Sequence, residues 1–408
     1  MSVRHEMLNA PVVPLRYLVE INPRPIAIQE ATSVYLPMEA ISGFGPADTN
    51  RRRPTDELQQ GYSYIANGDV AYAKVTPCFE NGKGIVAVDL PDGYAFATTE
   101  VTVLRPGSML DKAYLGWHLQ SEAFLTGGEA NMTGSGGLRR VPDTFTLTYT
   151  IPVPPRAAQR AIADYLDRET ARIDTLIDEQ QRLIEMLRDR RVATVAEALD
   201  GYEQTQLRRL VDHDRPMTYG ILQCGEPIDG GVVYIGPSDI LGEGVSPDRD
   251  ALRTTAPEIA SAYKRSALEG GDVVVSIGPA YGKVAVVSND LAGANLTQDT
   301  VRVALRPDLA DTRFIVWALM SRQTAEYWDY QIMGATFRRL NLGTLARTPI
   351  PLPAAHEQRR IAAYLDEQTA KIDMLITEAE RFIELSRERR SALITAAVTG
   401  QIDVREAA

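Results

Sequence analysis

The sequence predicts an α+β protein with two strand-rich domains separated by two long helices that pair as an antiparallel coiled coil. Residues 151–201 recur at 350–400 with 26 of 51 positions identical and no gap, which marks an internal repeat. Both copies carry apolar residues at heptad spacing. The region before each copy holds similar alternating runs and glycine turns. The chain therefore has a pseudo-two-fold internal repeat, in which a domain followed by a helix occurs twice.

Each copy of the repeat is expected to form one long helix. Pro152, Pro154 and Pro155 fix an extended approach, and no proline or glycine then interrupts the chain until about Leu199. Some 40 residues at 1.5 Å each give a rod roughly 60 Å long. Steps of three and four between apolar residues predict one narrow seam on each helix, and the two seams are expected to pair. The predicted pairing residues are Ile162, Leu166, Ile173, Leu176 and Leu183 in the first copy, and Ile361, Leu365, Ile372, Leu375 and Phe382 in the second.

The repeat divides the 408 residues into four segments. These are the first globular domain at 1–150, the first spacer helix at 151–201, the second globular domain at 202–349, and the second spacer helix with a C-terminal tail at 350–408. The globular regions match in short stretches, such as Gly68-Asp69-Val70 and Gly271-Asp272-Val273, where a turn precedes a strand. Between these stretches the loops differ. We expect residues 402–404 to lie against the first domain and close the duplicated chain into a ring.

Composition predicts a globular protein and limits its ligands. Hydrophobic residues make up 44% of the chain, and Cys78 and Cys224 form no disulfide or metal framework. The N-terminus carries no apolar signal core and no apolar run reaches the length of a membrane span, so we expect a cytoplasmic protein without membrane contact. The net charge of −11 counts against nucleic-acid binding. Any DNA contact must therefore come from local basic clusters, or from basic partner subunits.

No catalytic motif is present. Gly82-Lys83 and Gly282-Lys283 lack the spacing and the following Ser or Thr of a phosphate-binding loop, so each is expected to be a hairpin turn. The four histidines have no ligand spacing, and no Gly-x-Ser-x-Gly elbow occurs. Asn22-Pro23-Arg24-Pro25 does not match the loop of an amino-methyltransferase. We therefore expect a non-catalytic chain that carries no metal and no cofactor of its own.

The remaining candidates are polar and basic side chains suited to DNA. Arginine pairs follow glycine turns at matching places in both halves. Arginine can bind the outer edge of guanine through two hydrogen bonds, and glycine turns let the backbone approach phosphates. The alternative for any single arginine is a solvated surface position. The candidate DNA-binding residues are Arg51, Arg52, Arg53, Lys74, Asn81, Lys83, Ser135, Arg139, Arg140, Tyr281, Lys283, Thr336, Arg338 and Arg339.

Two further arginine pairs lie on the long helices and are expected to have another role. Arg190-Arg191 and Arg389-Arg390 occupy matching places in the two copies of the repeat. We expect these four side chains to lie on salt-bridged faces or to contact partner proteins.

Several of these motifs together resemble a known family, the specificity subunits of type I restriction–modification systems. The resemblance covers nearly the whole chain. It is carried by the duplicated blocks Ile-Pro-x-Pro, Gln-Arg-x-Ile-Ala, Tyr-Leu-Asp and Ile-Asp, and by the closing Leu-Ile-Thr-Ala-Ala-Val-Thr-Gly at 393–400. The stretches at 68–84 and 271–284 are also similar to the family.

The resemblance implies a function for each segment. Two target-recognition domains would each read one half of a split sequence in double-stranded DNA. The helices would hold the two domains apart and dock two modification subunits, which methylate adenine at N6 with S-adenosylmethionine. Motor–nuclease subunits would complete the restricting complex. Half-sites about one helical turn apart, ~34–36 Å, require such a stiff spacer. An alternative from another class is a coiled-coil scaffold that binds only proteins, and a third is an enzyme with an unrecognised site.

Overall fold

The structure, a computed structural model, describes residues 3–24, 28–135, 137–333 and 338–404. The chain forms two compact units. Unit 1 comprises Met1–Gln181 with Arg381–Ala408, and unit 2 comprises Arg182–Glu380. Each unit therefore contains one globular domain together with the first part of one long helix and the last part of the other. The predicted segment boundaries at 150/151 and 349/350 fall within short strands just before the long helices.

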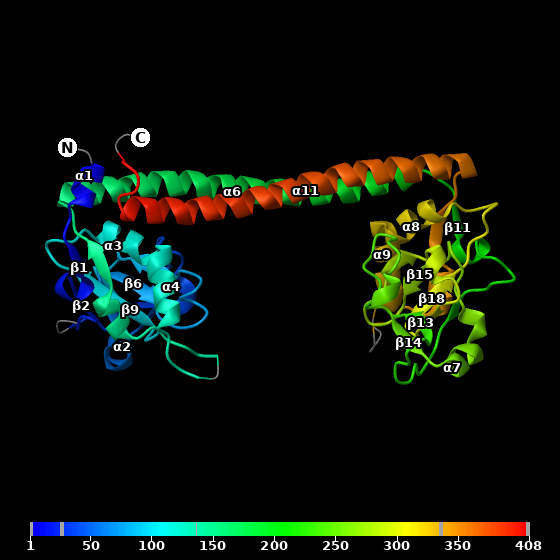
Figure 1. The fold of residues 1–408 in the computed structure, drawn as a ribbon, viewed down its shortest axis with the longest axis horizontal. Coiled ribbons are helices and arrows are strands. Elements are labelled where there is room, and N and C mark those ends of the chain that lie inside the picture. Colours follow the sequence, from blue (N-terminus) through cyan, green and yellow to red (C-terminus); the bar gives the residue numbers. More distant parts are fainter. Residues whose placement is uncertain (1–2, 25–27, 136, 334–337, 405–408) are drawn as a thin grey trace. The chain divides into compact units, whose positions relative to one another are not determined.

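Unit 1 contains two sheets, in the strand orders β2-β9-β6-β7 and β4-β3-β8-β5, and a short ladder of β1 with β10 (Figure 1). Its helices are α1 (Val3–Leu8), α2 (Thr55–Gly61), α3 (Lys112–Leu119), α4 (Glu122–Ala130), α5 (Asp143–Thr148) and the start of α6 (Arg156–Leu199). Its strands are β1 (Val12–Pro14), β2 (Val19–Ile21), β3 (Thr32–Leu36), β4 (Arg52–Pro54), β5 (Ser63–Ala66), β6 (Val70–Ala73), β7 (Gly84–Val86), β8 (Tyr94–Ala97), β9 (Val101–Pro106) and β10 (Thr150–Pro152).

Unit 2 repeats much of this plan, with the strand orders β12-β18-β15-β16 and β14-β13-β17 and a ladder of β11 with β19. Its helices are α7 (Pro257–Ala262), α8 (Thr312–Met320), α9 (Arg322–Ile332), α10 (Leu342–Ala346) and the start of α11 (Ala355–Val398). Its strands are β11 (Gln204–Gln206), β12 (Thr218–Tyr219), β13 (Val232–Ile235), β14 (Arg253–Thr255), β15 (Val273–Ser276), β16 (Val284–Val286), β17 (Asn295–Leu296), β18 (Thr300–Val303) and β19 (Pro349–Pro351). The predicted α+β class, with strand-rich domains and long helices, is confirmed.

The matching Gly-Asp-Val stretches begin the central strand of each unit. Gly68 and Gly271 have φ values of +98° and +90°, a conformation that glycine adopts without the steric cost of a side chain. Asp69 and Asp272 then each accept a hydrogen bond at 2.8 Å from a backbone N–H three residues earlier, which closes the turn. All four residues of β6 and all four of β15 are buried, so these strands lie at the centre of their sheets.

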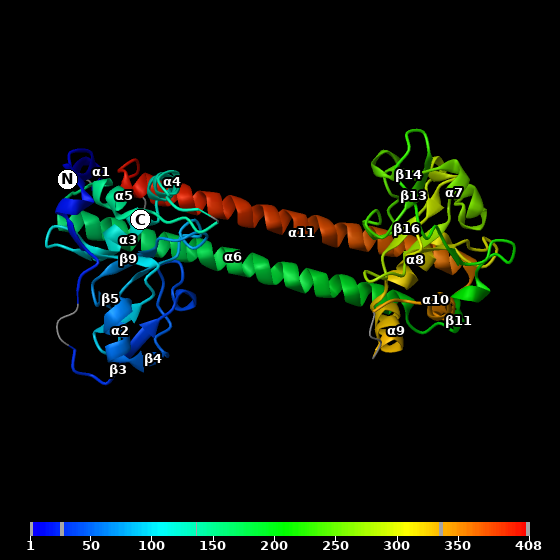
Figure 2. The same ribbon diagram turned by 90° about the horizontal axis from the view of Figure 1, so that it is seen from below.

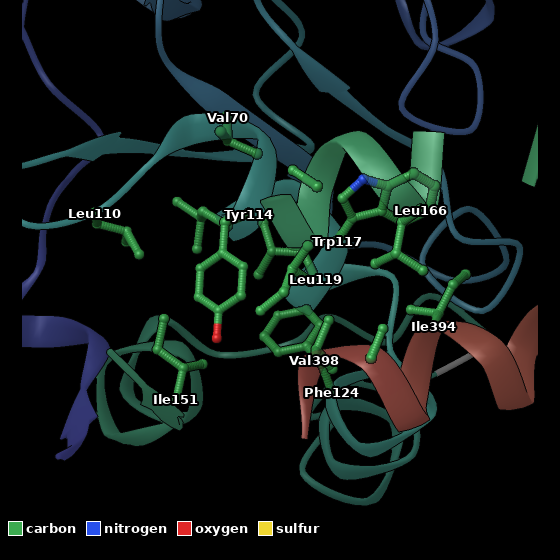
Figure 3. Close-up of a cluster of buried hydrophobic side chains, with 14 of the residues drawn as sticks. Val70, Leu110, Tyr114, Trp117, Leu119, Phe124, Ile151, Leu166, Ile394 and Val398 are labelled. Atoms are coloured by element: carbon green, nitrogen blue, oxygen red, sulfur yellow. The ribbon is translucent and has the colours of Figure 1, made fainter. Parts of the chain in front are cut away.

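The core of unit 1 joins the sheet to both long helices. Tyr114 and Trp117 of α3 lie between the sheet and the helices, and Tyr114 donates a hydrogen bond to the Pro152 carbonyl at 3.0 Å (Figure 3). Ile394 of α11 belongs to the same buried cluster, as do Val398 and Val404. Val404 is 3% exposed, and Ile402 packs against the cluster. The predicted contact between the C-terminal tail and the first domain is confirmed.

The long helices are paired antiparallel within each unit, because the first part of one packs with the last part of the other (Figure 2). In unit 1, Arg390 of α11 bonds Asp174 of α6 at 3.0 Å. In unit 2, Arg191 of α6 bonds Asp373 of α11 at 3.1 Å. These two ion pairs are related by the 199-residue repeat. Of the two roles expected for Arg191 and Arg390, the structure contains the ion-paired one.

The heptad phase of the seam differs from the prediction at four positions. Buried seam residues follow steps of four and three from Leu166 through Thr170, Ile173, Ile177 and Ile184. The second helix uses the same phase, from Leu365 through Thr369, Ile372, Ala379 and Ile383. The predicted seam residues Leu176, Leu183, Leu375 and Phe382 are instead 43%, 37%, 50% and 41% exposed.

The physical reason is that all four of these residues stand directly before an isoleucine. A one-residue change of phase exchanges one apolar position for the next, so composition alone permits both seams. The small side chains of Thr170 and Thr369 settle the choice, because each hydroxyl bonds the carbonyl four residues earlier and remains buried. The other predicted residues, at 162, 166, 173, 361, 365 and 372, are buried.

Candidate nucleic-acid interface

The first candidate surface in unit 1 is a glycine–arginine loop, residues 133–140, held beside the end of β6. Thr133 and Arg140 exchange two backbone hydrogen bonds of 2.8 and 2.9 Å, which close the loop. The Thr76 N–H donates to the Arg139 carbonyl at 2.9 Å, and the Val141 N–H donates to the Lys74 carbonyl at 2.8 Å. The structure thus brings Lys74 beside Arg139 and Arg140, which lie 65 or more positions further along the chain.

Carboxylates hold both arginines of this loop. Arg140 donates two hydrogen bonds to Glu100, from Nε at 2.8 Å and from Nη2 at 2.7 Å. The Arg140 guanidinium lowers the pKa of the Glu100 carboxyl, which therefore stays ionised. Arg139 lies 3.9 Å from Glu80. Both arginine side chains remain 46% exposed, so a phosphate or a base edge can reach them.

The Gly-Lys turns are hairpin turns, as predicted. Gly82 and Gly282 have φ values of +64° and +88°, and each turn joins two neighbouring antiparallel strands. Lys83 Nζ donates to the Met38 carbonyl at 3.3 Å, and Lys283 Nζ donates to the Pro237 carbonyl at the same distance. Both lysines are half-buried and anchor a loop to the turn in each unit. Asn81 and Ser135 are exposed.

Unit 2 has an equivalent arrangement beside β15. The Leu340 N–H donates to the Ile277 carbonyl at 3.0 Å, so the second arginine pair also lies at the end of the central strand. Arg339 bonds Asp299 at 2.9 Å, as its counterpart in unit 1 bonds Glu100. Arg338 and Tyr281 line a cavity of about 400 Å³. Thr336, the other candidate in this loop, lies outside the described residues.

Tyr281 is fixed by a neighbouring helix. Its hydroxyl donates to Asp329 of α9, and this hydrogen bond raises the pKa of the phenol. The phenol therefore stays protonated at neutral pH and acts as a donor toward the carboxylate. The oxygen lone pairs of Tyr281 and the guanidinium of Arg338 face the same cavity. This combination offers both an acceptor and donors to a polar ligand.

The triple arginine lies on a different sheet from the loop arginines. Arg51 bonds Glu39 at 2.6 Å, and Arg52 of β4 bonds Asp92 at 2.7 Å. Arg53 lies over the ring of Tyr35, 4.4 Å from its centroid. These three side chains are thus partnered at the outer sheet of unit 1, and the structure does not bring them next to residues 133–140.

Comparisons with known proteins identify the family. Residues 228–381 match the sequence model described as the type I restriction modification DNA specificity domain. The chain is 34% identical over 204 residues to the specificity subunit of the type I restriction enzyme EcoEI of Escherichia coli, an alignment that covers 47% of this chain and 33% of that protein. The chain belongs to the type I specificity-subunit family.

Solved structures agree with this assignment at the level of the fold. A chain from a study of the complex assembly and conformational transition of the type I R-M system matches with a TM-score of 0.77 and 18% identity, covering 96% of this chain and 98% of that one. The HsdS subunit from Thermoanaerobacter tengcongensis matches with a TM-score of 0.60 and 19% identity, over 96% and 97% of the two chains. In sequence, the specificity subunit aligns with about a third of the length of its curated relatives from E. coli.

Sequence reasoning missed an aromatic group on the outer sheet of this specificity subunit. Tyr64 of β5 and Tyr94 of β8 stack with ring centroids 5.9 Å apart, and Phe96 packs edge-on against both. Tyr35 and Tyr62 form a second edge-to-face pair 5.1 Å apart. The alternation of Tyr62 with Tyr64, and of Tyr94 with Phe96, is the signal that could have identified it, because alternate residues of a strand share one face.

Two further properties concern the part of the chain that the structure describes. None of the described helices combines the length and the apolar character needed to cross a membrane. Among these same residues, no group of His, Cys, Asp and Glu side chains is placed to hold a metal ion.

Proposed function

We propose that this chain is the non-catalytic, sequence-specific DNA-binding specificity subunit of a type I restriction–modification complex, and that it recognises a bipartite target in double-stranded DNA. The observation that carries the proposal is the duplication of one reading arrangement. In each unit an arginine pair lies beside the end of the central strand, next to a Gly-Lys hairpin turn. Two equivalent surfaces on one chain suit a target with two separated halves.

Differences between the units support separate targets. Unit 1 carries the triple arginine and the aromatic group on its outer sheet, whereas the corresponding sheet of unit 2 has the order β14-β13-β17. Unit 2 places Tyr281 where unit 1 has Asn81 at the hairpin turn. A shared scaffold with different side chains at its rim is suited to reading two different base sequences.

The proposed partners are two modification subunits, which would bind S-adenosylmethionine and methylate adenine at N6, and motor–nuclease subunits that would cleave DNA. The cofactor would thus belong to the partner and not to this chain. Exposed apolar side chains on the long helices supply a docking surface: Leu176 and Phe382 in unit 1, and Leu183 and Leu375 in unit 2. Apolar residues this exposed on a paired helix are typical of protein contacts. Such a complex would act in the cytoplasm, where it meets chromosomal DNA.

The docking surface can be tested without breaking the helix pair. Leu176→Asp combined with Leu375→Asp changes exposed positions, so the variant should fold with an unchanged circular dichroism spectrum. It should fail to co-purify with the modification subunit. Ile177→Asp is the contrasting variant, because it places a charge in the buried seam and should destabilise the chain itself. A double variant that still assembles fully would rule out this surface as the docking site.

Modification mapping tests the function as a whole. The chain is expressed with its neighbouring modification subunit, and N6-methyladenine is located by single-molecule sequencing. A split motif with a fixed unread gap, methylated in both halves, is the expected result. A single continuous motif would contradict two readers. Absence of any motif in an active complex would favour a coiled-coil scaffold that binds only proteins.

A further inference from the structure

An arginine is buried at the centre of the main sheet of unit 2. Arg302 of β18 pairs with Val274 of β15 on one side and with Thr218 of β12 on the other, and only 5% of its surface is exposed. The equivalent position in unit 1 is Val103, which pairs with Ala71 and is fully buried. Unit 2 therefore has a charged side chain where unit 1 has a core residue. Such a charge is costly to bury unless it is paired.

Arg302 has no carboxylate partner among the described residues. Its Nη1 donates to the Ala267 carbonyl at 2.9 Å, its Nη2 donates to the Pro216 carbonyl at 3.1 Å, and its Nε is buried without an acceptor. The acidic side chains nearby are already taken. Arg215 bonds Asp272 at 2.6 Å and Glu269 at 3.1 Å.

A cavity of about 630 Å³ opens onto this arginine. Four cationic side chains line it, from Arg215, Lys264, Arg265 and Arg302, against two acidic ones, from Asp214 and Glu269. Lys264 and Arg265 are exposed at its rim, and the Arg302 guanidinium is buried at its base. Burial and the neighbouring Arg215 charge both lower the pKa of Arg302, so the site favours a compensating negative charge.

We propose that this cavity binds a phosphate group. A tetrahedral oxyanion accepts several charge-assisted hydrogen bonds at once, and the guanidinium presents its donors as a planar fork. Phosphate would supply the negative charge that Arg302 lacks and would be held at the rim by Lys264 and Arg265. Backbone phosphates of DNA and free phosphate share this chemistry. The cavity lies along β12 and β18, whereas the Gly-Lys turn of unit 2 joins β15 to β16, the strand at the other edge of the sheet.

The primary test titrates inorganic phosphate into the full-length chain, by calorimetry at constant ionic strength with chloride as the balancing anion. Arg302→Val introduces the unit 1 residue and should weaken phosphate binding by at least about tenfold, the effect expected from losing charge-assisted hydrogen bonds. It should also raise the melting temperature in phosphate-free buffer, because a buried unpaired charge is removed. Lys264→Gln with Arg265→Gln changes only exposed positions, and should weaken binding with the fold intact.

The matched control is Arg322→Gln, which alters an exposed arginine of unit 2 on α9, away from the cavity. It should bind phosphate as the parent does. Absence of phosphate binding by the parent chain overturns the proposal. Equal binding by the parent and by both cavity variants also overturns it, because the anion would then be held elsewhere.

A second arm identifies the source of the phosphate. Duplex DNA binding is measured for the chain in complex with its modification subunit, over a series of salt concentrations. If the phosphate belongs to DNA, Arg302→Val should weaken duplex binding and reduce the salt slope by about one. Unchanged duplex binding, with inorganic phosphate binding lost, assigns the cavity to a free phosphate. A complex that binds no duplex would contradict the proposed function, yet the phosphate titration would still test the cavity.

Discussion

The repeated glutamine at the start of each long helix is a connection whose loss should be large and local. Gln159 is fully buried near the first turn of α6. Its Oε1 accepts a hydrogen bond from the Asp111 N–H at 2.8 Å, and its Nε2 donates to the carbonyls of Met109 at 2.9 Å and Pro154 at 2.8 Å. Asp111 also caps α3, so this one side chain joins the long helix to the domain.

The substitution Gln159→Met keeps the length of the side chain and removes all three hydrogen bonds. It would leave one buried N–H and two carbonyls without these partners. Each unsatisfied group costs at least about 1 kcal/mol, so we expect unit 1 to lose about 3 kcal/mol of stability. At 25 °C this corresponds to a rise of about two orders of magnitude in the equilibrium constant for local opening.

Hydrogen exchange followed by mass spectrometry measures this opening peptide by peptide. Amides of α3 and of the first turns of α6 should exchange about two orders of magnitude faster in the variant, where exchange is limited by the opening equilibrium. The matched substitution Gln358→Met removes the equivalent bonds to Asp311, Leu309 and Pro353 in unit 2. Each variant should accelerate exchange in its own unit. Acceleration below about threefold, or equal acceleration in both units, would refute this account of the glutamine.

Two further predictions concern the helix phase and an ion pair. Ile177→Ala, in the buried seam, should lower the free energy of unfolding by about 2 kcal/mol, whereas Leu176→Ala should change it by less than about 1 kcal/mol; chemical denaturation of both variants checks this, and a larger effect at 176 would restore the predicted phase. Because Arg140 lowers the pKa of Glu100, their contact stabilises the fold above the unfolded-state pKa of Glu and loses this effect as pH falls through the lower folded-state pKa. Melting temperatures of Arg140→Gln and of the parent should therefore differ at pH 7 and converge in acid, and a difference that is constant with pH would count against the pair.

The long helices were predictable because their signals are local and occur twice. The prolines before each helix, the lack of breakers and the repeat of Gln159 and Gln358 need no knowledge of the tertiary fold. The phase of the seam was not predictable in the same way. Leu176 and Ile177 are both apolar, and the choice between them depends on which neighbours are packed against the helix.

The candidate DNA residues were harder to judge from the sequence because their partners are distant in the chain. Arg140 and Glu100 are 40 positions apart, as are Arg52 and Asp92. A run of arginines looks free in the sequence, yet in the structure these side chains are held by carboxylates. Arg302 was misleading in the opposite sense. It alternates with valines in a strand, a pattern typical of a solvent-facing residue, and it is buried.

The two units differ in how they satisfy one shared turn of the duplicated fold, and this difference bears on Arg302. In unit 1, Arg105 of β9 donates two hydrogen bonds of 2.8 Å to Asp69. The arginine before the matching proline in unit 2, Arg306, pairs with Asp308 instead. Asp272, the counterpart of Asp69, is bound by an arginine from a different segment, at position 215.

The exchange of donors explains why the charge on Arg302 is unmatched. Arg215 and Arg302 both lie near Asp272, but the carboxylate accepts its hydrogen bonds from Arg215 alone. Unit 2 therefore contains one more buried cation than unit 1, among the described residues, without an additional buried carboxylate to match it. A charge retained at this cost to folding is best accounted for by a ligand that compensates it, which is the role that we assign to phosphate.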